Sequence, residues 1–118
     1  MPNDKEIFYS QYRLAAPVTE FSGAFIQFMA NRMAVSYHKY GPVADGYPGR
    51  VDAIASLKQR LEKYEETGNT EFLVDASNFA MIEFMHPRRP NAHFRPTDSD
   101  ESPGRTRVNG SVDSERNA

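Results

Sequence analysis

The apolar residues of the chain fall into three helix-length runs separated by glycine- and proline-rich turns. The third run, over residues 69–85, is apolar around most of its circumference, which is typical of a helix packed on several sides. A polar line interrupts it, since Glu71, Asp75 and Asn78 recur at i, i+4 and i+7 and share one face. A carboxylate is costly to bury without a cation or a hydrogen-bond partner. The polar line therefore indicates either a salt-bridged seam between helices or a binding site.

The first run, over residues 19–40, predicts a helix that Thr19 caps and Glu20 supports in its first turn. The run carries two apolar lines, the first made of Phe21, Phe25, Phe28 and Val35 and the second of Ile26, Met29, Met33, Tyr37 and Tyr40. A surface helix of a monomer needs only one such line, so two lines predict contact with a second chain. Gly23 inside the run is a candidate for a close helix crossing.

Residues 41–49, GPVADGYPG, are a dense turn signal and predict a loop rather than a helix. The run over 50–67 then predicts a second amphipathic helix, which Gly68 ends as a left-handed cap. Asn69 or Thr70 is expected to cap the following helix. A connection this short makes the second and third helices antiparallel neighbours.

The two ends of the chain differ from its middle. Residues 1–17 are too apolar for a free tail and predict a docking segment, whereas residues 87–118 are rich in Pro, Arg, Ser and Asp. Beyond about residue 103 too few aliphatic side chains remain to offset chain entropy, which predicts a largely disordered tail. We therefore expect an all-α domain over residues 18–86, with three main helices that form an oligomeric bundle because one chain offers a small core.

Composition narrows the classes of function. The chain has 118 residues, no cysteine and a formal charge of −2, so it is one domain at most and has no disulfide or cysteine-ligated zinc. The charge argues against generic nucleic-acid binding. No apolar run reaches the roughly 18 residues of a membrane span, and the first residues lack a secretion-signal pattern. The expectation is a soluble cytoplasmic protein.

Two accounts of the polar line stay open from the residues alone. In an antiparallel pair of helices, Arg60 and Lys63 come roughly opposite Asp75 and Glu71, which predicts a salt-bridged seam. Alternatively, carboxylates at i and i+4 share a hard divalent cation such as Mg²⁺.

Basic residues flank the glycine–proline loop and are candidates for binding an anion. Lys39 precedes the loop, and Arg50 is expected in the first turn of the helix that follows it. Free amides at a helix start also favour phosphate.

Four short segments carry a further signal: HKYG at 38–41, RLEKY at 60–64, GNTE at 68–71 and DASNF at 75–79. In this order they resemble the all-α nucleoside triphosphate pyrophosphohydrolases of the MazG-like family, especially small phage and actinobacterial members. The resemblance covers roughly residues 20–85. The last acidic motif reads E-x-x-x-D here where the family usually has E-x-x-D, and the family's earlier E-E-x-x-E motif is not found at the matching place.

The resemblance implies a dimeric helical bundle and Mg²⁺-dependent hydrolysis of a (deoxy)nucleoside triphosphate to monophosphate and pyrophosphate. The implied site consists of Glu71 and Asp75 as catalytic residues and metal ligands, with Lys39, Arg50, Arg60 and Asn78 as nucleotide contacts. The alternative is a non-catalytic, phage-type helical module that binds a nucleotide or inhibits a protein partner. A purely structural helical subunit is a third possibility.

Overall fold

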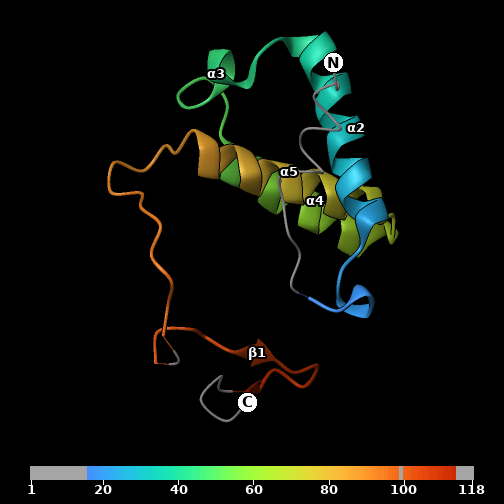
Figure 1. The fold of residues 1–118 in the computed structure, drawn as a ribbon, viewed down its shortest axis with the longest axis vertical. Helices are drawn as coiled ribbons and strands as arrows, with labels where there is room; N and C mark the ends of the chain where they lie inside the picture. The colour runs from blue at the N-terminus through green and yellow to red at the C-terminus, as the bar shows by residue number, and fades with distance from the viewer. Residues whose placement is uncertain (1–15, 99, 114–118) are drawn as a thin grey trace. The chain divides into compact units, whose positions relative to one another are not determined.

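A computed structural model describes residues 16–98 and 100–113 of the chain (Figure 1). These residues form the 3₁₀ turn η1 (Val18–Glu20), the helices α2 (Gly23–Tyr40), α3 (Val43–Gly46), α4 (Ala53–Thr67) and α5 (Glu71–Met85), and the strands β1 (Arg105–Thr106) and β2 (Val112–Asp113). The chain divides into two units, Met1–Arg88 and Arg89–Ala118. The mainly helical fold expected from the sequence is confirmed. Almost all of the predicted docking segment, 1–17, lies outside the described residues.

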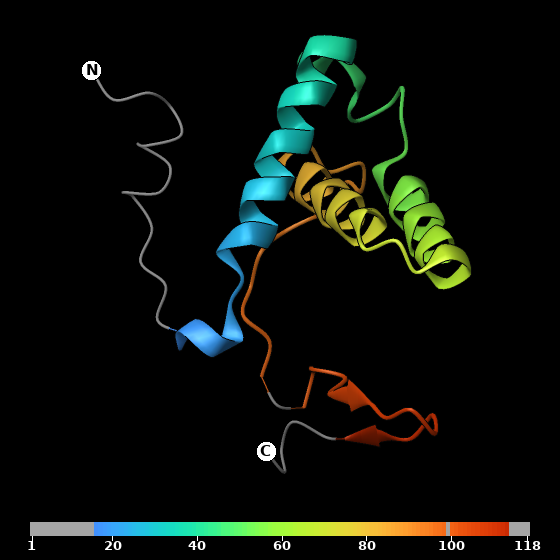
Figure 2. The same cartoon turned by 90° about the vertical axis from the view of Figure 1, so that its right-hand side faces the viewer.

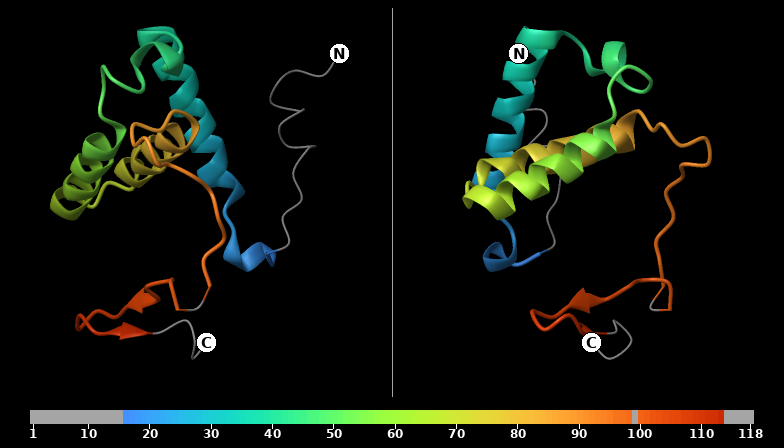
Figure 3. Two further views of the ribbon diagram at one scale, coloured as in Figure 1. Left: turned by 90° about the vertical axis from the view of Figure 1, so that its left-hand side faces the viewer. Right: turned by 180° about the vertical axis from the view of Figure 1, so that it is seen from behind.

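Helix α5 is the middle helix of the first unit, with α4 packed along one side and α2 crossing it on another (Figures 2 and 3). Helices α4 and α5 run antiparallel, joined by three residues (Figure 2). Gly68 ends α4 in the left-handed conformation with φ of 73°, and its N–H donates to the Tyr64 carbonyl at 2.8 Å. The Asn69 side chain accepts from the Glu71 N–H at 3.0 Å at the start of α5. The predicted cap and the short connection are confirmed.

Helix α2 starts later than the sequence pattern predicted. Ser22 has an extended backbone and its Oγ accepts from the Phe25 N–H at 3.0 Å, so the helix begins at Gly23. Thr19 instead lies in η1. A Cβ at Gly23 would meet nothing within 4 Å, so among the described residues of this chain no helix crosses closely there.

The loop between α2 and α4 contains one helical turn, α3, where only loop was predicted. The Asp52 carboxylate caps α4 by accepting from the Ala55 N–H at 3.0 Å, so this helix begins at Ala53. Arg50 therefore lies before the helix, and its predicted place in the first turn is wrong. The amides at this helix start already have an acidic side-chain partner.

The first unit buries few apolar side chains. Within the described residues the buried apolar positions are Ala53, Val74, Ala76 and Ile82, and α2 contributes none of them. On α2, Met29 and Met33 of the second apolar line are half-buried, whereas Phe28 and Val35 of the first line are 54% and 56% exposed. One side of α2 thus stays uncovered by the described part of its own chain.

No helix within the described residues, 16–98 and 100–113, is long and apolar enough to cross a membrane.

The second unit contains a short antiparallel hairpin in which Arg105 pairs with Asp113 and Thr106 with Val112. The turn uses Gly110 at φ of 91°, and the Ser111 N–H donates to the Asn109 side chain at 3.0 Å. The sequence predicted a largely disordered tail and did not predict this hairpin. An Asn-Gly turn and arginine–aspartate pairs form it locally, without an aliphatic core.

Candidate functional site

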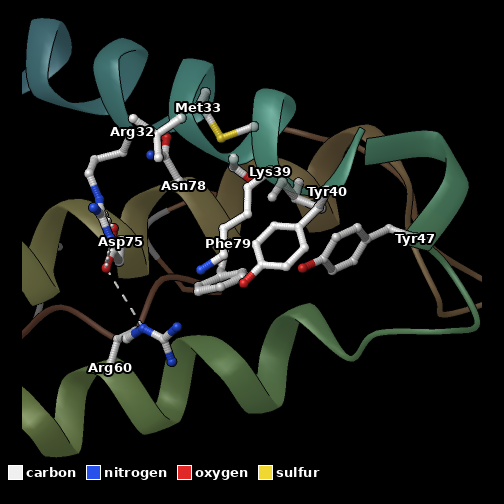
Figure 4. Close-up of a pocket in the computed structure, with 12 residues that line it drawn as sticks. Arg32, Met33, Lys39, Tyr40, Tyr47, Arg60, Asp75, Asn78 and Phe79 are labelled. Carbon is white, nitrogen blue, oxygen red and sulfur yellow. Dashed lines mark hydrogen bonds and ion pairs between the residues drawn. The ribbon is translucent and has the colours of Figure 1, made fainter. Parts of the chain in front are cut away.

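The polar line of α5 meets cations from two other helices, and we call these residues the charged cluster: Arg32, Arg60, Glu71 and Asp75. Asp75 accepts two hydrogen bonds from Arg32 of α2, at 3.0 Å from Nε and 3.2 Å from Nη2. Its Oδ2 also lies 3.8 Å from Nε of Arg60 on α4. The Asp75 side chain is only 13% exposed, so these cations replace much of its hydration. Figure 4 shows both arginines converging on Asp75.

Arg60 is oriented by two neighbours besides Asp75. Its guanidinium carbon lies 5.1 Å from the centre of the Phe79 ring, and its Nη1 donates to Oε1 of Gln59 at 2.7 Å. These contacts come from α5 and from α4 itself. They hold a partly buried cation at a fixed place between the two helices.

The salt-bridged seam predicted from the sequence is confirmed in one half and wrong in the other. Arg60 pairs with Asp75 as expected. Lys63 pairs instead with Glu66 at 3.3 Å, one turn away on its own helix. Glu71 lies 3.8 Å from Arg32, and its side chain is 56% exposed.

Sequence reasoning missed Arg32, which forms the closest contact to Asp75. A signal for it was present, because Arg32 occupies the gap between Phe28 and Val35 in the first apolar line of α2. A charged residue within an apolar line indicates a partner on the neighbouring helix. Its bond with Asp75 raises the pKa of Arg32, so this guanidinium carries its charge at every physiological pH.

A cavity of about 330 Å³, the first cavity, lies beside the charged cluster. Three cations line it, Arg32 and Lys39 from α2 and Arg60 from α4, against one carboxylate, Asp75. Its other walls include the rings of Tyr40, Tyr47 and Phe79. In Figure 4 Arg32, Arg60 and Asp75 lie at one end and the two tyrosine rings at the other, with Lys39 between them. An excess of positive charge beside aromatic rings suits an anionic ligand with a planar part.

Asn78 lines the same cavity but is 5% exposed. Its Nδ2 donates to the Met29 carbonyl of α2 at 3.1 Å, which helps to hold α2 against α5. Its Oδ1 is buried, with no hydrogen-bond partner among the described residues. A buried orphan acceptor is unusual in a folded protein and leaves one polar atom to be satisfied by a water or a ligand.

The structure brings together four of the six predicted site residues, since Lys39, Arg60, Asp75 and Asn78 all line the first cavity. The other two lie elsewhere. Arg50 lines a neighbouring cavity of about 490 Å³, the second cavity. Glu71 lines a third cavity, beside Phe28 and the start of α5.

The donor set fits Mg²⁺ poorly. Both oxygens of Asp75 are engaged by arginine, and Arg32 also lies near Glu71. Within the described ranges, no three acidic or histidine side chains gather closely enough to hold a metal ion. Proteins usually hold Mg²⁺ with one or two carboxylates together with water and phosphate oxygens, and carboxylate oxygens that already accept from arginine are less available to it. The arrangement is better suited to binding an anion.

Comparison with known proteins gives no relative on which to base a function. No family model, no curated protein and no solved structure matches the chain.

Proposed function

We propose that the first cavity binds the phosphate groups of a nucleotide and that the protein is a nucleotide-binding helical module. The observation that carries this proposal is the excess of cations, because Arg32, Lys39 and Arg60 line one cavity with a single carboxylate. Arginine side chains bind phosphate oxygens through paired, charge-assisted hydrogen bonds. A volume of about 330 Å³ lies within the range of roughly 300–1,000 Å³ that small-molecule sites occupy.

Asp75 acts in this proposal as an internal anion. It already accepts from Arg32 and lies beside Arg60, so it holds both cations in place while the cavity is empty of ligand. A bound phosphate competes with Asp75 for the same N–H groups. The carboxylate thus sets how strongly an anion must bind before it replaces the internal contact.

Mg²⁺-dependent hydrolysis of a nucleoside triphosphate by Glu71 and Asp75 stays a prediction. The spacing of these two acids on α5 supports it, and the arginines around Asp75 weigh against it. Inhibition of a protein partner is the remaining alternative for a module without catalysis.

A cytoplasmic location agrees with a nucleotide ligand and with a chain that has no cysteine.

Self-association through α2 is part of the proposal. Phe28 and Val35 are more than half exposed and stand seven residues apart, which is the spacing of a helix–helix seam. Since no side chain of α2 is fully buried, a second copy would supply the contacts that one chain lacks. A homodimer is the simplest such assembly.

The test is isothermal titration of the purified protein with nucleoside triphosphates, with and without Mg²⁺, followed by an assay for released pyrophosphate. Binding without Mg²⁺ and without turnover is the expected result. Binding that requires Mg²⁺, together with pyrophosphate release, would replace the binding module by the hydrolase. No heat of binding with any nucleotide would overturn both and leave a protein partner as the target.

A further inference from the structure

We infer that the second cavity is the subsite for the base of the nucleotide, so that the ligand spans both cavities. This inference rests on the proposed function, because it assumes that the phosphates lie in the first cavity. The base would then give the ligand its selectivity, through the residues that line the second cavity.

The two cavities share part of their walls. Tyr40, Tyr47, Phe79 and Arg60 line both of them, together with Ser36. The second cavity has a volume of about 490 Å³ and extends from this shared wall towards the loop between α2 and α4. A ligand with phosphates beside Arg32 and Lys39 therefore passes the tyrosine rings to reach the larger space.

The charges that line the two cavities indicate which end of the nucleotide lies in which cavity. The first cavity has three cations and one carboxylate, whereas the second has Arg50 and Arg60 with the carboxylate of Asp45. The excess of positive charge is larger in the first. Phosphates are accordingly stabilised more strongly there, and the uncharged base is left for the second cavity.

Aromatic side chains at the junction offer a stacking surface. Burial raises the pKa of the Tyr47 phenol, so its ring stays neutral at physiological pH and carries no negative charge towards a phosphate. Tyr40 has its ring within 5.1 Å of the Lys39 amine, which places a cation and an aromatic face side by side. Nucleotide bases of every kind stack on such rings, because each base has a planar aromatic face.

Polar groups in the second cavity match the edge of a base better than a phosphate. Ser56 donates its hydroxyl proton to the Asp52 carbonyl at 2.8 Å, which leaves its oxygen as an acceptor. The carboxylate of Asp45 is also an acceptor in this cavity. Gln59 accepts from Arg60 through Oε1, which leaves its amide N–H groups as donors. A base edge presents both donors and acceptors, whereas polyphosphate presents acceptors almost exclusively.

The experiment compares the four common nucleoside triphosphates with inorganic tripolyphosphate by isothermal titration in the absence of Mg²⁺. We expect at least one nucleotide to bind about tenfold or more tightly than tripolyphosphate, since base stacking supplies that much affinity. Tyr47→Leu should remove most of this advantage, because it takes the stacking ring from the wall that both cavities share, so nucleotide binding should fall several-fold more than tripolyphosphate binding. Tyr37→Leu is the matched control, because Tyr37 is exposed on α2 and lines neither cavity.

Asp45→Lys provides a second variant that tests the same subsite from an exposed position in α3. It should change the ranking of the four nucleotides without weakening tripolyphosphate. Tripolyphosphate binding as tightly as every nucleotide would overturn the base subsite and leave the proposed function intact. Absence of binding by all five ligands would overturn the proposed function and the inference together. Circular dichroism of each variant checks that the helices are retained.

Discussion

Arg32 of α2 and Asp75 of α5 form a two-point hydrogen bond, with Nε 3.0 Å from Oδ1 and Nη2 3.2 Å from Oδ2. Since Arg60 of α4 lies 3.8 Å from the same carboxylate, Asp75 links its own helix α5 to the other two long helices of the first unit. This contact has a structural role and a functional one. It links helices that share a small apolar core, and it occupies cations that we propose bind phosphate.

Asp75→Asn separates these roles. We expect the variant to lose about 1–3 kcal/mol of unfolding free energy in urea denaturation, because a charge-assisted pair becomes a weaker amide contact. We also expect tighter nucleotide binding without Mg²⁺, because both arginines are released from a competing anion. Loss of Mg²⁺-dependent nucleotide binding or turnover, together with unchanged or raised stability, would instead support Asp75 as a metal ligand.

Glu71→Gln is the matched control for that experiment. Glu71 carries the same charge on the same face of α5, but its side chain is 56% exposed and lies 3.8 Å from Arg32. Exposed ion pairs contribute about 0–1 kcal/mol, so the stability of this variant should stay within that range. An equal loss of unfolding free energy in both variants would mean that the Arg32–Asp75 hydrogen bonds stabilise the fold no more than an exposed ion pair does.

Gly68→Ala tests the connection between α4 and α5. Gly68 has φ of 73°, where an alanine is disfavoured by about 1–2 kcal/mol, although a Cβ there would meet nothing within 4 Å. We expect a loss of unfolding free energy of that size in urea denaturation. Gly23→Ala is the control, since Gly23 has the same open surroundings but starts α2 at negative φ, and it should leave stability unchanged or slightly raised.

Tyr47 makes the stability of the folded protein depend on pH in the alkaline range. Burial raises the pKa of its phenol above the ordinary value of 10.0, so the unfolded chain ionises first as pH rises. The stabilisation from the neutral phenol is complete below pH 10 and is lost as pH rises through the higher folded value. Chemical denaturation at pH 9 and at stepwise higher pH should show a steeper decline for wild type than for Tyr47→Phe. Parallel declines would show that the phenol makes no contribution.

Phe28→Glu tests self-association through the first apolar line of α2. We expect the wild-type protein to sediment as a dimer and the variant as a monomer, because a carboxylate cannot be buried in an apolar seam without a partner. Val18→Glu is the control, since Val18 is exposed outside α2 and should not affect association. A monomeric wild type at micromolar concentration would contradict the proposed homodimer.

Local sequence signals determined much of the helical framework. Gly68 ends α4, a three-residue connection makes α4 and α5 neighbours, and Arg60 lies opposite Asp75 as the helical repeat requires. These features depend on residues close in sequence or on the geometry of one helix pair. They can therefore be predicted from residue propensities and from spacing along the sequence.

Helix starts were less certain, because several residues compete for the same capping role. Ser22 caps α2 in place of Thr19, and Asp52 caps α4, which moved Arg50 out of the helix. Which oxygen reaches a free amide depends on the backbone entering the helix. Both Ser22 and Asp52 have the extended backbone that brings their side chains to the third following N–H.

Only the tertiary structure decided which residues share a site. Arg32 lies 43 positions from Asp75, and its importance depends on how α2 crosses α5, which no local pattern specifies. The same crossing placed Lys39 beside Arg60 at one cavity and left Glu71 at another. The sequence by itself determined that a polar line on an apolar helix needs partners, because burying charge is costly. The packing of three helices decided that Arg32 joins Arg60 as a partner of Asp75.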